Sequence, residues 1–344
     1  MKNFCILGGR QSGISLVEIM VSMVVGLLVL AGILYVYSGN RVAFQFNENM
    51  SRLQEGGRIA MDVISNDLRM ASFTGCARSG NVRVMGGVGV TTQQLEQGVW
   101  VGAYPTDPEA LAIVDSAPFV GKVGTDVLRV FGSTGSGASL EKPLANVFSN
   151  LEVSSGSVIS QVSNGNILIV GDCQVADMFS VNGIATAGAT TTITAPAGGL
   201  SKTYGEDAMV IRYGGNKTYY LREAANPDGT KRLDSSGAPV VSLFQDGIEL
   251  VEGVDAFRVC LGIDDSLDGT VDRYLRSNDP AVNWANVVAV QVDMLMASVS
   301  PNALDQAVNQ QFSLCLDAVP SINLNDRRMR KMFSTNIALR NKLK

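Results

Sequence analysis

The feature that most constrains this chain is a long apolar segment close to its N-terminus. Residues 19–37 contain no charged side chain, and Glu18 is the single charge among the residues from Ile14 to the end of that run. At about 1.5 Å per helical residue, the segment can cross roughly 30 Å of hydrocarbon. Lys2 and Arg10 precede it, and positive charge on that side favours a cytoplasmic N-terminus. The sequence therefore predicts one membrane-spanning helix.

The residues before the apolar segment form a candidate leader peptide. An ordinary secretory signal is cut after its apolar region, whereas the small pair Ser12-Gly13 precedes the apolar region here. A cut after Gly13 would remove residues 1–13 and leave the helix attached to the mature chain. Glu18 would then be the fifth mature residue, and a carboxylate in a spanning helix costs a few kcal/mol unless it is paired or neutralised. We expect a partner for Glu18; the alternative is an interfacial carboxylate that reaches the headgroups.

The helical pattern continues beyond the apolar segment and becomes amphipathic. Apolar residues recur at mostly three- or four-residue intervals, which is typical of one buried helical stripe. They are Val42, Phe46, Met50, Leu53, Met61, Ile64 and Leu68. We expect one helix from Ile14 to about Ala71, with a transmembrane half over 14–38 and an amphipathic half over 39–72.

After residue 72 the pattern changes to short β-rich runs separated by polar turn residues, which predicts a sheet-rich head over 73–344. Candidate strands are Val127–Phe131, Ile167–Val170, Met209–Tyr213, Thr218–Leu221, Val288–Met296 and Phe333–Leu339. Asn226–Gly229 predicts a turn, and 154–166 and 183–199 are interpreted as surface loops. The expected fold class is α+β: a long N-terminal helix packed on a C-terminal β-sheet-rich head.

Composition argues against most enzymes and against a general nucleic-acid binder. The chain has no histidine, so the commonest general base and transition-metal ligand are missing. Its 36 glycines form no phosphate-binding or nucleophile-elbow motif. A formal charge of -5 does not suit a protein that must displace counterions from phosphates.

Five cysteines are present, and Cys5 would be lost with the leader. The remaining four are Cys76, Cys173, Cys260 and Cys315. If the head faces an oxidising compartment, two disulfides are expected, with three possible connectivities. We favour Cys76 with Cys173 and Cys260 with Cys315; four buried free thiols are the alternative.

An acidic segment over 264–272 is a candidate calcium loop. Asp264, Asp268 and Asp272 place carboxylates at spaced positions around a glycine, as calcium loops do. Leu275 stands where a bidentate glutamate would be expected, so a plain acidic hairpin turn is the alternative. No other cofactor is expected.

A basic cluster lies near the C-terminus, at Arg327, Arg328, Arg330, Lys331, Arg340, Lys342 and Lys344. It could meet anionic headgroups or an acidic partner. The alternative is a strand edge that solvated charge protects from pairing.

Residues 13–18 resemble the recognition site of type IV prepilins, with isoleucine where the family usually has phenylalanine. The resemblance implies that a prepilin peptidase cuts after Gly13 and methylates the new N-terminus at Ile14. It also implies that Glu18 meets the positively charged N-terminus of a neighbouring subunit. Tyr35 stands where many major pilins have proline, so the helix lacks that helix-bending residue.

Landmarks along the rest of the chain resemble the PilW family of minor pilins. They are residues 54–62, 67–71, Gly75-Cys76, 172–179, 271–274 and 326–341. The resemblance implies a minor pilin in or near the pilus tip that helps to prime assembly and to present an adhesin, supporting twitching motility and attachment. Other major and minor pilins and a tip adhesin of the PilY family would be its partners. It would sit in the bacterial inner membrane with a periplasmic head, and then in the pilus fibre.

Two other functions compete with this interpretation. A pseudopilin of a type II secretion system would share the leader, Glu18 and the helix, but normally has a smaller head. A membrane-anchored periplasmic enzyme or sensor is the alternative of another class, and the sequence offers no assembled catalytic site for it.

Overall fold

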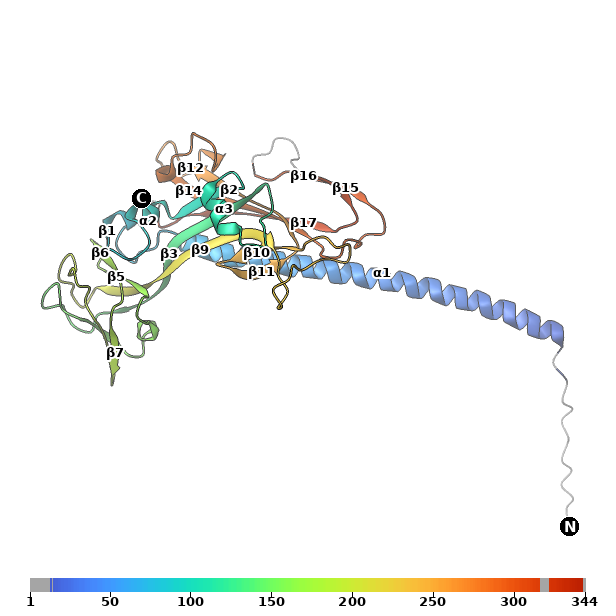
Figure 1. Cartoon of the computed structure of the whole chain (residues 1–344), viewed down its shortest axis with the longest axis horizontal. Helices are drawn as coiled ribbons and strands as arrows, with labels where there is room; N and C mark the ends of the chain where they lie inside the picture. The colour runs from blue at the N-terminus through green and yellow to red at the C-terminus, as the bar shows by residue number, and fades with distance from the viewer. Residues whose placement is uncertain (1–12, 14, 316–321, 343–344) are drawn as a thin grey trace, which may run out of the picture. The chain divides into compact units, whose positions relative to one another are not determined.

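The computed structural model describes residues 13, 15–315 and 322–342. The chain divides into two compact units, Met1–Ser51 and Arg52–Lys344. Helix α1 (Leu16–Arg69) contributes its first part to one unit and its last part to the other. The rest of the second unit is the β-rich head (Figure 1). A long apolar helix together with a strand-rich head confirms the expected α+β class.

The described part of the first unit is almost entirely helical. Its apolar side chains from Leu16 to Tyr37 are all exposed. Among the described residues, α1 is the one helix that is long and apolar enough to cross a membrane. Its start at Leu16 and its end at Arg69 lie within two residues of the expected bounds.

In the second unit, the last turns of α1 bury one face against the head. The buried apolar side chains are Leu53, Ala60, Met61, Ile64 and Leu68. Gly56 and Gly57 bring the helix backbone close to the strands, since a β-carbon on Gly57 would lie 2.2 Å from Cε2 of Phe333. The four expected stripe positions from Leu53 to Leu68 are therefore core residues of the head.

The larger sheet has eight strands and is antiparallel except for the β1–β6 pair. Its main path is β1 (Val82–Val84), β6 (Ala176–Ser180), β5 (Ile167–Gly171), β9 (Met209–Glu223), β10 (Val241–Gln245) and β11 (Ile248–Glu252). β3 (Thr125–Ser139) also pairs with β9, and β2 (Val99–Tyr104) pairs with β3. The two runs expected at 209–213 and 218–221 belong to one strand, β9, which continues through Gly215 at φ +83°.

The second sheet has four antiparallel strands and lies against the same helix. Its order is β13 (Arg273–Arg276), β12 (Val254–Ile263), β14 (Val287–Ala297) and β17 (Arg330–Ala338). A hairpin of β15 (Val308–Phe312) and β16 (Ile322–Asp326) packs Phe312 and Leu324 against Leu295 of β14. The hairpin and the helix thus cover the sheet that contains the alternating segment 288–296.

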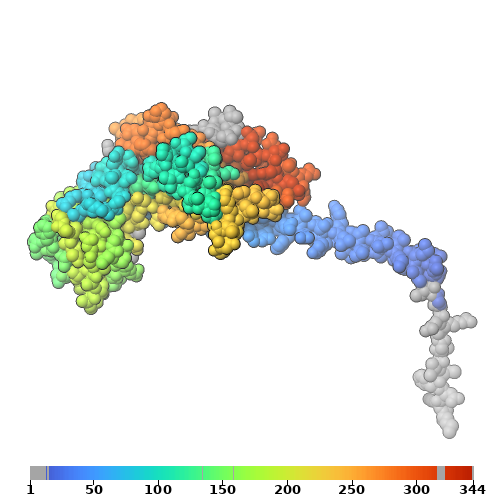
Figure 2. All heavy atoms as spheres, in the orientation of Figure 1, coloured from blue at the N-terminus to red at the C-terminus, as the bar shows by residue number. Residues whose placement is uncertain are grey.

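A separate lobe interrupts the chain between β3 and β9 and projects from one end of the head (Figure 2). It contains a three-stranded sheet of β4 (Leu151–Ser154), β8 (Thr190–Ile193) and β7 (Ile184–Ala187). Its residues Leu151, Ile159, Ile193 and Tyr204 share one core with Leu168, Phe179 and Val210 of the larger sheet. The interpretation of 183–199 as a loop was therefore wrong for β7 and β8, because Thr and Ala side chains hid a hairpin whose pattern of apolar residues is weak.

Five short helical segments complete the described structure. They are η1 (Ser79–Asn81), α2 (Thr92–Gln97), α3 (Pro108–Val114), η2 (Val158–Gln161) and η3 (Trp284–Asn286). Helix α2 begins with a capping box in which the Thr91 hydroxyl accepts from the Gln94 N–H and the Gln94 side chain accepts from the Thr91 N–H. Local sequence therefore fixes both the start and the direction of this short helix.

Candidate functional site

The first candidate site is the segment around Gly13 and Glu18. Gly13 is exposed, and a β-carbon added there would meet no atom within 4 Å. Glu18 lies in the first turn of α1, and its carbonyl oxygen accepts a hydrogen bond from the Ser22 hydroxyl at 2.7 Å. Within the described residues, the Glu18 carboxylate makes no hydrogen bond or ion pair. Ile14, the expected mature N-terminus, lies outside the described residues.

An unpaired carboxylate at this position has a physical consequence. The side chains that follow Glu18 are apolar and exposed along about five turns of helix, so the surroundings that suit them are a membrane or other helices. In such surroundings an ionised carboxylate is unfavourable by a few kcal/mol unless a cation or a donor approaches it. A cation or a hydrogen-bond donor close to Glu18 would remove this cost.

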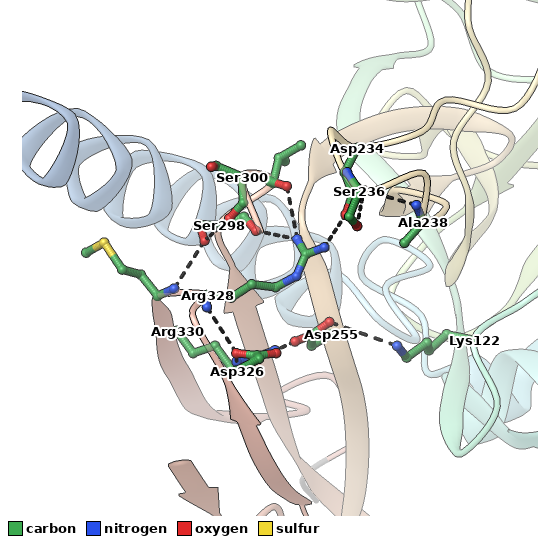
Figure 3. A network of polar contacts seen from close by, with 12 residues as sticks. Lys122, Asp234, Ser236, Ala238, Asp255, Ser298, Ser300, Asp326, Arg328 and Arg330 are labelled. Carbon is green, nitrogen blue, oxygen red and sulfur yellow. Dashed lines mark hydrogen bonds and ion pairs between the residues drawn. The ribbon is translucent and has the colours of Figure 1, made fainter. Parts of the chain in front are cut away.

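The second candidate site is a polar network in the head, built on the segment between β16 and β17 (Figure 3). Arg330 lies almost fully buried, with its side chain 2% exposed. It donates two parallel hydrogen bonds to Asp326 at 2.6 and 2.7 Å and a third to Asp255 of β12 at 2.7 Å. These hydrogen bonds from Arg330 hold the pKa of Asp326 below its usual value. Lys122 lies 3.9 Å from the other Asp255 oxygen, at the edge of the network.

Arg328 extends the network to a different part of the head. Its guanidinium donates to the carbonyl oxygens of Ser298 and Val299 at 2.7 and 3.0 Å and forms an ion pair with Asp234 (Figure 3). Asp234 is buried, and it also accepts from Ser236 and from the Ala238 N–H. Burial alone would raise the pKa of Asp234, but these hydrogen bonds together lower it to about 2.

The network corrects the interpretation of the C-terminal basic cluster. Arg328 and Arg330 are paired inside the head, and Arg327 donates through Nε to the Leu304 carbonyl oxygen at 2.8 Å. Lys342 donates to two backbone carbonyl oxygens, and Lys344 lies outside the described residues. Of the described members, Arg327, Lys331, Arg340 and Lys342 have no ion pair within the described chain. The structure therefore removes Arg328 and Arg330 from the basic surface that the cluster was expected to offer.

A further buried carboxylate, which sequence reasoning missed, joins the two sheets. Asp126 of β3 is 1% exposed and accepts a hydrogen bond from the Val259 N–H of β12 at 2.8 Å. Arg258 and Arg276 each come within 3.7 Å of its second oxygen. Burial raises the pKa of Asp126 in spite of these two cations. Because the partners are far away in sequence, no local pattern indicated the role of Asp126.

Polar contacts also fix the C-terminal end of α1 to the head. The Tyr219 hydroxyl donates to Asp67 at 2.5 Å, and the Gln245 amide donates to the same oxygen at 3.1 Å. The Asn341 amide donates to the carbonyl oxygens of Arg69 and Ala71 at 3.2 and 2.9 Å, which satisfies acceptors left open where the helix ends. Sequence analysis did not anticipate these contacts.

Among the described residues there are two disulfides, and both join the favoured pairs. Cys76 bonds to Cys173 with a Cα–Cα distance of 4.5 Å, and Cys260 bonds to Cys315 with a Cα–Cα distance of 6.0 Å. The first links the segment that follows α1 to the segment between β5 and β6, and the second links β12 to the segment that follows β15. Each bond therefore connects parts of the head that are far apart in sequence.

The acidic segment 264–272 uses its carboxylates to close a turn. Asp264 accepts from the Gly269 N–H at 2.8 Å, and Asp272 accepts from the N–H groups of Asp265 and Ser266 at 2.8 Å. Asp268 accepts from the Thr270 N–H at 2.8 Å. Within residues 13, 15–315 and 322–342, no group of three or more His, Cys, Asp or Glu side chains is placed to hold a metal ion. Calcium binding by Asp264, Asp268 and Asp272 stays an untested prediction.

Comparison with known families agrees with this anatomy. The family described as "Prokaryotic N-terminal methylation motif" matches residues 8–34, which include Gly13, Glu18 and the first turns of α1. The family described as "Type IV Pilus-assembly protein W" matches residues 218–341, from the second half of β9 to the Asn341 cap. Comparisons with curated proteins and with solved structures gave no match.

The methylation motif, the exposed apolar helix and the strand-rich head define a prepilin. Proteins of this class are anchored in a membrane by their N-terminal helix. Within that class, residues 218–341, about a third of the chain, are similar to the type IV pilus-assembly protein W family. The polar network of Arg328 and Arg330 lies inside the region that matches this family.

Proposed function

We propose that this protein is a minor pilin that enters the type IV pilus at or near its tip and helps to prime pilus assembly. A prepilin peptidase removes residues 1–13 and methylates the new N-terminus at Ile14. Before assembly, α1 spans the bacterial inner membrane once and the head lies in the periplasm. After assembly, the protein is part of the fibre at the cell surface.

The observation that carries this proposal is the carboxylate of Glu18. It follows the proposed cut by five residues, lies in an exposed apolar helix and has no partner within the described chain. The positively charged N-terminus of a neighbouring pilin is a group of the right charge at the right depth, since it begins the same kind of helix. Neutralisation of Glu18 would then couple membrane extraction to docking against the next subunit.

The head supports a structural role in recognition. Its conspicuous charged groups, Arg328, Arg330 and their acidic partners, are paired with one another, which suits a rigid scaffold. We infer that the protein is not an enzyme and that it acts through other major and minor pilins and a tip adhesin of the PilY family. Through these partners it supports twitching motility and attachment.

The match to the pilus-assembly family favours the pilus over a type II secretion system. A deletion strain separates the two functions. Loss of surface pili with normal secretion supports the proposal, whereas normal pili with impaired secretion would contradict it.

The direct test is the identity of the mature N-terminus. Protein isolated from sheared pili should begin with N-methylated Ile14 when it is analysed by mass spectrometry. Gly13→Val should leave an unprocessed precursor in the membrane fraction, because the peptidase requires a small residue before the cut. The proposal would be ruled out if protein isolated from cells retained residues 1–13 and the protein were absent from sheared pili.

A further inference from the structure

A hollow of about 660 Å³ lies in the head away from the polar network. Its walls come from η1, from α2, from η3 and from the residues that follow β17. Pockets that bind small molecules have volumes of about 300 to 1,000 Å³. The hollow therefore has room for a ligand of one or two rings.

Lys342 holds two of these walls together. Its ammonium group donates to the carbonyl oxygen of Gln97 in α2 at 3.1 Å and to that of Trp284 in η3 at 3.0 Å. Burial of the ammonium group lowers the pKa of Lys342 to about 8. This lysine thus positions the two walls and is not itself a free ligand group.

The other walls are fixed as well. Asn81 at the end of η1 donates to the carbonyl oxygen of Gln174, the residue next to the disulfide of Cys173 with Cys76. The side chain of Asn341 is held by the end of α1, as described above. A site whose walls are fixed before binding loses less conformational entropy when a ligand enters.

The side chains that line the hollow are rich in unused hydrogen-bonding groups. Within the described chain, the guanidinium of Arg78, the amides of Gln93 and Gln97 and the indole N–H of Trp284 make no hydrogen bond to protein. Each glutamine offers two donors and an acceptor, and the guanidinium offers five donors. This differs from the network of Arg328 and Arg330, in which the guanidinium groups donate to carboxylates and carbonyls.

These groups suit a hydroxyl-rich ligand better than the alternatives. A phosphorylated ligand needs a cationic site, but the carboxylate of Glu96 faces the same hollow as Arg78 and Lys342. An apolar peptide side chain needs an apolar floor, and apart from Trp284 the largest apolar side chain in the lining is Val282. A sugar ring presents hydroxyl groups that both donate and accept, together with an apolar face that an indole can cover.

We propose that this hollow binds a neutral saccharide of one or two sugar residues. Trp284 packs against a ring face, while Gln93, Gln97 and Arg78 hydrogen-bond the hydroxyl groups. This inference stands apart from the proposed role in assembly, because the lining residues lie in the head, far along the chain from Gly13 and Glu18.

The chain offers a direct optical test, because Trp284 is one of only two tryptophans. The other, Trp100, packs beneath the Arg129 guanidinium at 5.5 Å from the ring centre. In the full-length Trp100→Phe protein in detergent, the fluorescence of Trp284 should change saturably with methyl glucoside, methyl galactoside or N-acetylglucosamine. We expect a dissociation constant on the order of 1 mM for at least one of these probes. Saturation-transfer NMR on the unmodified protein gives a second readout that does not depend on Trp100.

Matched variants locate the binding. Gln97→Ala and Trp284→Phe should each weaken binding about tenfold, whereas Gln161→Ala, which removes an exposed glutamine in η2, should have no effect. Three results would overturn the proposal: no saturable signal with any sugar, binding that Gln97→Ala leaves unchanged, or binding of a capped Gly-Ser-Gln peptide in place of the sugars. The Gln97→Ala strain should assemble pili normally, because sugar binding at this site is proposed to be independent of pilus assembly.

Discussion

The aromatic ring of Phe333 in β17 lies directly against Gly57 of α1, so closely that a β-carbon on the glycine would approach its Cζ atom to 2.3 Å. Gly57→Ala should therefore destabilise the head although alanine is the better helix former by about 1 kcal/mol. Displacing a packed ring costs about 1 to 3 kcal/mol, which exceeds that gain. Chemical denaturation of the purified full-length protein in detergent measures the difference.

A control for this substitution exists in the same helix. A β-carbon on Gly39 would meet no atom within 4 Å, so Gly39→Ala should be neutral or slightly stabilising. Adding Phe333→Leu to Gly57→Ala should recover part of the loss, since a smaller side chain leaves room for the new methyl group. Equal effects of Gly57→Ala and Gly39→Ala would show that the close contact does not matter.

The ion pairs of Arg330 predict a large effect of a neutral substitution. Arg330→Met leaves Asp326 and Asp255 without the cation that satisfies them, and it should lower the free energy of unfolding by about 2 to 3 kcal/mol. The cost stays below that of a fully buried pair because both acids keep some contact with solvent. Arg340→Met, which removes an exposed arginine, should change stability by less than about 0.5 kcal/mol in the same denaturation experiment.

Asp234 predicts a loss of stability in acid. Its pKa in the folded protein is about 2, below the ordinary value of 3.8, so the folded state favours the ionised form. The stabilisation is fully present above pH 3.8 and is lost as the pH falls from there through about 2. Urea midpoints measured between pH 5 and pH 2.5 should fall more steeply for the parent than for Asp234→Asn. Parallel curves for the two proteins would contradict the prediction.

Glu18 predicts a defect in assembly that spares folding. Glu18→Ala should be cleaved after Gly13 as usual, and its head should unfold at the same denaturant concentration as the parent. Its amount in sheared pili should fall more than about tenfold, because loss of the charge pair removes more than about 1.4 kcal/mol of docking energy. Immunoblots of the membrane and pilus fractions report both results, and undiminished incorporation would refute the role of Glu18.

Much of the fold follows from local patterns. The absence of charge over 19–37 and the stripe from Leu53 to Leu68 predicted α1 to within two residues, because helical periodicity is a property of neighbouring residues. Alternation over 288–296 predicted β14, and the residues around Gly13 and Glu18 predicted the methylation motif that matches the chain.

The parts that escaped prediction depend on contacts between distant residues. Arg330 pairs with Asp255, which lies 75 residues earlier, and Asp126 meets Val259, which lies 133 residues later. Sequence alone showed a basic cluster, and only the folded chain shows which of its members are neutralised. The β7–β8 hairpin was missed for another reason: its Thr and Ala side chains differ little in hydrophobicity, so the two faces of each strand look alike.

The cap that Asn341 places on α1 has a consequence for biosynthesis. The side-chain amide of Asn341 and the Arg69 carbonyl oxygen that accepts its hydrogen bond are separated by 272 residues. The carbonyl oxygens at the end of α1 therefore lack this donor until Asn341 has been synthesised. Such a distant closure slows folding far more than it weakens the folded state. The contact that closes the end of α1 is therefore among the last that a newly made chain can form.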